Sequence, residues 1–122
     1  MTYAEKLKSP EWQKKRLEIF NRDMFTCTMC NSKEKTLHVH HKVYIFDKEP
    51  WDYVDDFYTT LCENCHKVEE QDKVMFHKII KHFLLKGLTY KELLEDILPI
   101  IQMYRDKYNY TAQDIVKYNQ YV

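Results

Sequence analysis

Two pairs of cysteines constrain this sequence more than any other feature. Each pair has the spacing Cys-x-x-Cys, one at Cys27 and Cys30 and the other at Cys62 and Cys65, and 31 residues separate the two pairs. Four thiolates in two such knuckles can surround a tetrahedral Zn²⁺ and close a structural site. The alternatives are a redox role, which accounts for only one pair, and two buried pairs without metal. The spacing favours one structural zinc ion that links the ends of the intervening segment.

The composition fits one compact domain inside the cell. The chain has 122 residues, of which 44% are hydrophobic, and this is enough for a small core. No apolar run approaches the roughly 20 residues of a membrane-spanning helix, and the charged N-terminal segment does not resemble a secretory signal. We therefore expect a cytoplasmic protein without membrane contact, in which paired cysteines bind metal.

The formal net charge is zero, but the charges are segregated along the chain. Residues 1–48 hold ten basic residues (Lys or Arg) and six acidic ones (Asp or Glu). Residues 49–72 hold one basic and eight acidic residues, and residues 73–122 hold eight basic and five acidic residues. A zero total argues mildly against a nucleic-acid partner, whereas the basic front segment suits a phosphate backbone. Scattered solvated charge is the alternative interpretation.

The periodicity predicts an α+β chain that is mostly helical. Ser9 and Pro10 are typical of a helix start, and apolar residues at helical spacing extend this helix to about residue 21. Alternating apolar and polar residues predict a half-buried strand over 36–44. Residues 59–61 are expected to form a second short strand, and helical residues resume near residue 63.

The C-terminal part of the sequence is expected to be entirely helical. An apolar stripe predicts a helix from Asp72 that Gly87, the only glycine, ends as a C-cap. Thr89 and Glu92 form a capping box for the next helix. Pro99 is expected to kink that helix or to make it restart.

This tail is expected to depend on a neighbour for its stability. Thr111 begins a last short helix that ends near residue 120. We divide the chain into residues 1–71 with the cysteines and residues 72–122 as a helical extension. Because about fifty residues alone are marginal, the extension should pack on the first part in a single domain, or form a homodimer contact.

Histidines supply a second possible metal site. Three of the six lie within residues 38–41, and His66 directly follows the last cysteine. His66 and Glu70 lie four residues apart on one helical face. With His40 from the strand they form a three-ligand set for a divalent ion, with positions left open for water and a phosphate oxygen. His41 suits the removal of a proton from water.

A plainer interpretation of these histidines stays open. His66 or His40 would then be an occasional zinc ligand, or all of them would be exposed. His38, His77 and His82 are expected to be structural or solvated. Strict strand alternation also sends His40 and His41 to opposite faces, so a twist, bulge or strand end must bring both toward one phosphate.

Several motifs follow one another between Trp12 and about Glu70: W-x3-R, RDMFTCTMC, LHVHH and TTLCENCH. In this order they resemble the four-cysteine subgroup of the HNH endonuclease family, and residues after Asp72 resemble no family. The resemblance implies a ββα-metal core with a four-cysteine zinc site, followed by the helical tail. It also implies hydrolysis of DNA phosphodiester bonds that leaves 5′-phosphate and 3′-hydroxyl ends.

The resemblance assigns a role to each histidine of the second set. It implies that His40 is the first metal ligand, His41 the general base and His66 the metal ligand on the helix. Glu70 stands where the family often has a further histidine, and its carboxylate suits a hard ion such as Mg²⁺ or Mn²⁺. Ni²⁺ or Zn²⁺ are the other candidates for the catalytic ion.

One family feature is replaced in this sequence. The middle asparagine of the family usually lies just before the second knuckle, where this chain has residues 55–57, Asp-Asp-Phe. Asp56 is the candidate substitute. The predicted function is a metal-dependent endonuclease of a bacterial or phage-infected cell. The alternative is a catalytically weak or inactive zinc module that binds DNA or a partner protein.

Basic residues of the front segment are expected to hold the DNA backbone, a contact that positions DNA without specifying sequence. They are Lys14, Lys15, Arg16, Arg22 and Lys42. The predicted partner is DNA, and the chain would act as a monomer or as a homodimer through its C-terminal helices.

Overall fold

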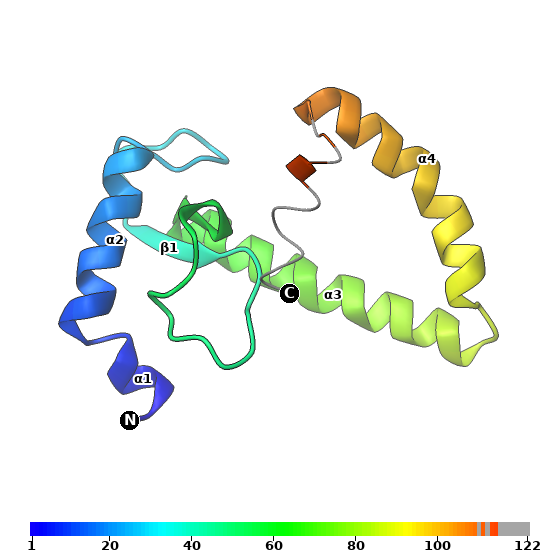
Figure 1. The fold of residues 1–122 in the computed structure, drawn as a ribbon, viewed down its shortest axis with the longest axis horizontal. Helices are drawn as coiled ribbons and strands as arrows, with labels where there is room; N and C mark the ends of the chain where they lie inside the picture. Colours follow the sequence, from blue (N-terminus) through cyan, green and yellow to red (C-terminus); the bar gives the residue numbers. More distant parts are fainter. Residues whose placement is uncertain (110, 112, 115–122) are drawn as a thin grey trace. The chain divides into compact units, whose positions relative to one another are not determined.

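The computed structural model describes residues 1–109, 111, 113 and 114 (Figure 1). The elements in chain order are α1 (Tyr3–Lys6), α2 (Pro10–Arg22), β1 (Leu37–His41), the 3-10 turn η1 (Asp55–Phe57), β2 (Tyr58–Cys62), α3 (Glu63–Leu85) and α4 (Tyr90–Tyr108). Helices dominate, and a two-stranded antiparallel sheet accompanies them. The predicted α+β class is confirmed at this level.

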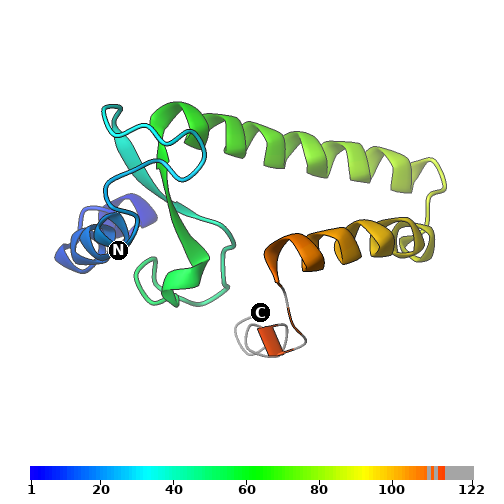
Figure 2. The same ribbon diagram turned by 90° about the horizontal axis from the view of Figure 1, so that it is seen from above.

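The chain divides into two compact units, Met1–Asp72 and Lys73–Val122. The division falls inside α3, which is one uninterrupted helix where the sequence suggested a boundary near residue 72 (Figure 2). In the part of the chain that the structure describes, no helix combines the length and apolar character needed to cross a membrane.

Helix α2 begins at the residues that its sequence indicates. The Ser9 hydroxyl accepts a hydrogen bond from the backbone N–H of Trp12 at 3.3 Å, and Pro10 is the first helical residue. An N-cap of this kind stabilises a helix by about 1 kcal/mol. The inner face of α2 buries Trp12, Ile19 and Phe20, and the helix contacts both strands.

The sheet pairs β1 with β2 so that Leu37 lies opposite Cys62 and His41 opposite Tyr58. The predicted strand over 36–44 is too long, because regular pairing ends at His41. The N–H of Lys42 still donates to the Phe57 carbonyl at 2.8 Å, and the chain then leaves the sheet. Sequence alternation continued past this point, but no partner strand continues beside it within the described residues.

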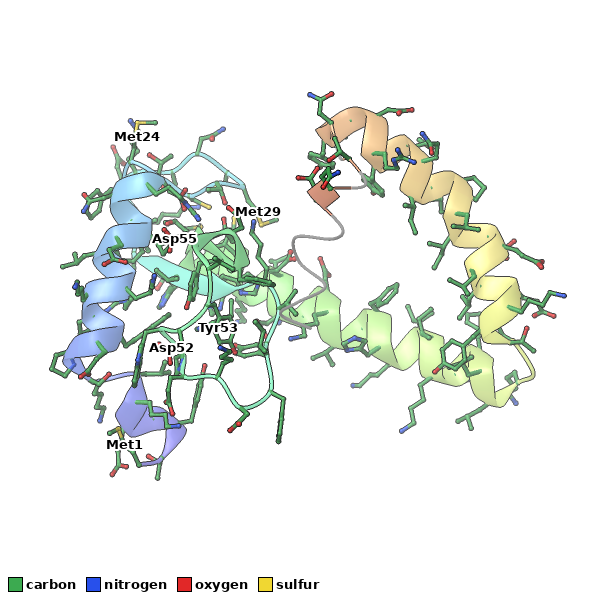
Figure 3. All side chains as sticks on the ribbon, in the orientation of Figure 1. Met1, Met24, Met29, Asp52, Tyr53 and Asp55 are labelled. Atoms are coloured by element: carbon green, nitrogen blue, oxygen red, sulfur yellow. The ribbon has the colours of Figure 1, made fainter. Side chains whose placement is uncertain are left out.

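The loop between β1 and β2 is closed by a tyrosine. The Tyr53 hydroxyl accepts from the N–H of Ile45 at 2.9 Å and donates to its carbonyl at 3.3 Å. Figure 3 labels Tyr53 within this loop. The loop therefore folds back over the end of the sheet, and this fold places Pro50 beside His41.

Two side chains of the core, Ile19 and Tyr58, come from α2 and β2, and both are fully buried. Arg22 and Asp23, at the end of α2, fasten the helix to the sheet. Arg22 donates to the Tyr58 carbonyl at 2.8 Å, and the Asp23 carboxylate accepts the N–H of Thr60 at 3.0 Å. The position of β2 against α2 is thus fixed by both packing and polar contacts.

The second unit contains the predicted helix signals with one exception. Gly87, with φ +115°, lies just after α3 as expected, and Thr89 and Glu92 form the capping box of α4. The prediction of a restart at Pro99 is wrong, because α4 continues through this residue. The predicted last helix lies largely outside the described residues.

The second unit, which contains the C-terminal part of α3 and all of α4, exposes apolar side chains. In α4 they include Leu94, Leu98 and Ile101, and in α3 they include Phe76 and Phe83. The expected stripes are therefore present, and the packing of this unit on the first stays a prediction.

Candidate metal centres

The four cysteines gather at the base of the sheet. The sulfur atoms of Cys27, Cys30, Cys62 and Cys65 all lie within 4.8 Å of one another, and none of the four is in a disulfide. The Cys30 and Cys62 sulfurs are 3.7 Å apart. Zinc–sulfur bonds of about 2.3 Å in a tetrahedron place the sulfurs about 3.8 Å apart. The cluster therefore has the dimensions of a zinc site.

Local backbone geometry shapes the first knuckle. The Cys27 carbonyl accepts the N–H of Asn31, and the Cys27 N–H donates to the Ser32 carbonyl, each at 2.9 Å. Asn31 has φ +63°, a left-handed conformation that asparagine tolerates better than most residues. The Thr28 N–H donates to the Thr60 carbonyl at 3.0 Å. The knuckle is thus tight and is attached to β2.

The second knuckle overlaps the end of β2 and the start of α3. Cys62 is the last strand residue, Glu63 begins the helix, and the Cys65 N–H donates to the Cys62 sulfur at 3.4 Å. The Glu63 N–H also donates to the Thr36 carbonyl at 2.9 Å. Strand, helix and knuckle are therefore joined at one point, and a metal there would hold all three.

The thiol pKa values reflect crowded sulfur atoms. Burial favours the neutral thiol of Cys27, but N–H groups of Cys30, Cys62 and Met29 outweigh burial and lower its pKa to about 6. The neighbouring Cys62 side chain, followed by burial, raises the pKa of Cys65 to about 12. Four thiolates cannot share this volume without a cation, and a bound divalent ion would remove the conflict.

A second cluster lies where β1 meets the first turns of α3. His40, His66 and Glu70 each offer one ligand atom, and these atoms lie within 4.8 Å of one another. The Nδ1 of His40 is 3.5 Å from Oε1 of Glu70, and the His40 and His66 rings meet edge to face at 5.2 Å. The structure thus brings the predicted three-ligand set together.

The donor atoms of this second cluster fit a cation. His40 is 5% exposed, and its Nδ1 and Oε1 of Glu70 are buried without a hydrogen-bond partner in the described part of the chain. Buried polar atoms of this kind normally have a partner. Burial first, and then the charge of His66, lower the pKa of His40. A neutral imidazole is the form that binds metal.

His41 lies on the opposite face of β1, as strand alternation requires. Its ring stacks on Trp12 at 5.0 Å and on Tyr44 at 5.1 Å. Its Nε2 lies 2.9 Å from the Pro50 carbonyl oxygen. Burial lowers the pKa of His41, and the bond to Pro50 opposes this shift. The rings around His41 and the bond to Pro50 thus hold its imidazole in one orientation.

A cavity of about 370 Å³ reaches both faces of the strand end. Its lining includes His41 and Trp12 from one face and His38 and His66 from the other, together with Arg16 of α2. The cavity brings His41 and His66 to one space, whereas His40 and Glu70 are not among its lining residues. The convergence of His40 and His41 on one phosphate therefore stays a prediction.

The predicted DNA-contacting residues differ in their surroundings. Lys15 is paired with Asp55 at 3.0 Å and with Glu18 at 3.3 Å. Arg22 donates to Asp23, to the Tyr58 carbonyl and to the Asp55 carbonyl. Lys14, Arg16 and Lys42 have no carboxylate partner within the described residues, and Lys14 and Lys42 are exposed. Two of the five are thus paired with carboxylates of the chain, and Arg16 donates to the Gln13 side chain at 2.7 Å.

Sequence reasoning overlooked two contributors to this site. Pro50 holds His41 through a backbone oxygen, which no side-chain motif can indicate. His38, expected to be structural or solvated, stacks on His66 at 5.4 Å, and the period of two along a strand would have placed it beside His40. Asp56, the candidate substitute for the asparagine, belongs to η1.

Comparison with protein-family models, with curated proteins and with solved structures gives no match.

Proposed function

We propose that this chain is an HNH-type endonuclease that hydrolyses DNA phosphodiester bonds with one divalent ion. The observation that carries the proposal is the three-ligand cluster of His40, His66 and Glu70, of which His66 lines the same cavity as His41. The cluster is separate from the four-cysteine site, and its ligands come from β1 and from α3, the helix that follows β2. A structural zinc site and an open ion site in one small unit suit a nuclease.

Each residue of the cluster has a task in this proposal. His40, His66 and Glu70 would hold Mg²⁺, Mn²⁺ or another divalent ion, which supplies positive charge to the phosphate and the leaving oxygen. The Pro50 oxygen can only accept a hydrogen bond, so Nε2 of His41 carries the proton in the neutral ring. The lone pair that takes a proton from the attacking water is then on Nδ1.

Arg16 is the best-placed basic residue for the scissile phosphate. It lines the same cavity as His41 and His66, and its guanidinium lies over the Phe20 ring at 5.4 Å. Lys14 and Lys42, both exposed, would add contacts to the DNA backbone. Contacts of this kind position the duplex without reading its sequence.

Nicking of supercoiled plasmid tests the proposal. The zinc-loaded chain should nick DNA with Mg²⁺, Mn²⁺ or Ni²⁺, and His41→Ala should slow cleavage roughly 100- to 10,000-fold, as expected for loss of a general base. Mn²⁺ affinity and DNA binding should stay close to wild type, because His41 is not a ligand. His40→Ala should instead weaken Mn²⁺ binding. His77→Ala, an exposed residue of α3, is the matched control.

One observation favours the alternative function, an inactive module that binds DNA or a partner protein. His41 is only 4% exposed and lies between aromatic rings, whereas a general base must reach water. Wild-type protein that binds DNA and Mn²⁺ but nicks with none of the ions would support this alternative.

A further inference from the structure

Two buried groups donate to the same backbone oxygen in the loop between β1 and β2. The Pro50 carbonyl lies 2.9 Å from Nε2 of His41 and 2.7 Å from the Tyr58 hydroxyl. The Tyr58 oxygen in turn accepts the N–H of Tyr53 at 3.1 Å. Tyr58 is fully buried, and His41, Pro50 and Tyr53 are buried around it.

The direction of every bond in this network follows from its chemistry. A carbonyl oxygen has two lone pairs and no proton, so both His41 and Tyr58 must donate to it. The Tyr58 hydroxyl donates its single proton to the Pro50 carbonyl. The Tyr58 oxygen therefore accepts the hydrogen bond from the Tyr53 N–H. Each group has one available role, so the network fixes one geometry rather than several.

The sheet places Tyr58 where it can do this. Tyr58 is the first residue of β2 and pairs directly with His41, the last residue of β1, and their rings lie 5.0 Å apart. Pro50 has no N–H of its own with which to anchor the loop. A hydroxyl from the rigid sheet therefore holds a loop carbonyl that would otherwise depend on His41 alone.

We infer that Tyr58 is a positioning residue for His41 and acts through the Pro50 carbonyl. In this inference Tyr58, and not the candidate substitute Asp56, orients the proposed base. Its catalytic consequence rests on the proposed nuclease function, but the hydrogen-bond relation can be measured without catalysis.

Tyr58→Phe is the test variant, because it keeps the ring beside His41 and Trp12 and removes only the hydroxyl. Thr59→Val is the matched control. Its hydroxyl bonds to Thr28 at 2.7 Å, so the variant loses a hydrogen bond from the same strand and leaves the Pro50 carbonyl unchanged.

The first measurement is NMR of the zinc-loaded full chain without a catalytic ion. In wild type, the ¹⁵N shifts of His41 should show the Nε2–H tautomer, with a cross-peak between this proton and the Tyr58 hydroxyl proton. In Tyr58→Phe, the Nε2 proton should exchange with water at least several-fold faster. Thr59→Val should match wild type. An Nδ1–H tautomer in wild type, or unchanged exchange in Tyr58→Phe, would overturn the inference.

The second measurement is plasmid nicking with Mn²⁺ affinity determined in parallel. Tyr58→Phe should cleave about three- to tenfold more slowly, the effect of one hydrogen bond, with unchanged Mn²⁺ binding. If wild type fails to cleave with every ion tested, the nuclease proposal fails. The NMR result still decides the role of Tyr58 in that case. If Tyr58→Phe does not fold, the tautomer and cross-peak of the wild-type chain decide it alone.

Discussion

His40 and His41 are neighbours in one strand and yet have opposite surroundings. His40 faces Glu70 and His66 with an unpartnered nitrogen, whereas His41 is enclosed by aromatic rings and bonded to Pro50. Burial lowers the pKa of both side chains, so both are neutral imidazoles near neutral pH. The period of two in a strand thus separates a ligand from a candidate base.

Glu70 gives a direct test of the ligand set. Glu70→Gln removes the negative charge near His40 but keeps the shape, and we expect Mn²⁺ affinity to fall at least tenfold because a hard ion prefers a carboxylate. Glu70→His restores a strong ligand at the same position and should bind Ni²⁺ or Zn²⁺ more tightly than Glu70→Gln. Calorimetric titration after zinc loading measures both. Equal Mn²⁺ affinity in Glu70→Gln and wild type would remove Glu70 from the site.

Asp23 gives a prediction about pH. Burial favours its neutral form, but hydrogen bonds from Arg22 and Thr60 outweigh burial and lower the pKa of Asp23. A depressed folded pKa stabilises the fold above the unfolded value of about 3.9, and this contribution is lost only as pH falls through the folded pKa.

Asp23→Asn should therefore destabilise the chain by about 1–3 kcal/mol. The difference from wild type in urea unfolding should be constant between pH 8 and pH 5, because the carboxylate stays ionised across this range. Zinc is kept in the buffer so that its loss does not contribute. A difference that shrinks steadily toward pH 5 would contradict the assigned pKa shift.

At the scale of elements, local sequence signals were sufficient to predict where the helices begin but not where strand β1 ends. Ser9 with Pro10, and Thr89 with Glu92, act through bonds within four residues, so the sequence shows them directly. The end of β1 at His41 depends instead on where β2 begins. Pro99 does not end α4, and the kink that was expected as the other outcome at this residue stays a prediction.

In the candidate site, too, the local features could be predicted from the sequence and the long-range contacts could not. Cysteine spacing and the i, i+4 relation of His66 and Glu70 were visible in the sequence, since both are local geometry. The Pro50 oxygen was not visible, because every residue has a carbonyl and only the folded loop selects one. The Tyr58 contact needed the strand register as well.

Zinc is predicted to hold the sheet, the first knuckle and α3 together. We expect one zinc ion per chain in protein purified without added metal, and Cys30→Ser should lose most of it. Because structural zinc contributes about 10–16 kcal/mol in small domains, chelation should abolish the folded signal of residues 1–72. Metal analysis and circular dichroism measure these results. Less than half an equivalent, with all four thiols reactive in the native state, would contradict the prediction.

At the scale of the whole molecule, the second unit has exposed apolar side chains that need a partner to cover them. Side chains such as Phe83, Leu94 and Leu98 are about half exposed or more, and monomeric proteins rarely leave large apolar patches in water. About fifty residues without a staple also have little stability of their own. We therefore predict that this unit packs on the first unit of its own chain, with a homodimer contact as the competing outcome.

Truncation after Asp72 separates these outcomes. Residues 1–72 keep both metal sites and the sheet, but they lose the predicted packing partner. If the tail packs within the chain, the truncated protein should melt at a lower temperature than the full chain, which should itself be monomeric by light scattering. A full chain that is dimeric, and a truncated one that is monomeric, would assign the apolar faces to a second copy. If residues 1–72 stay folded and monomeric and nick DNA as fast as the full chain, the tail is an independent appendage. A helix pair that contributes to a shared core cannot be removed without loss of stability.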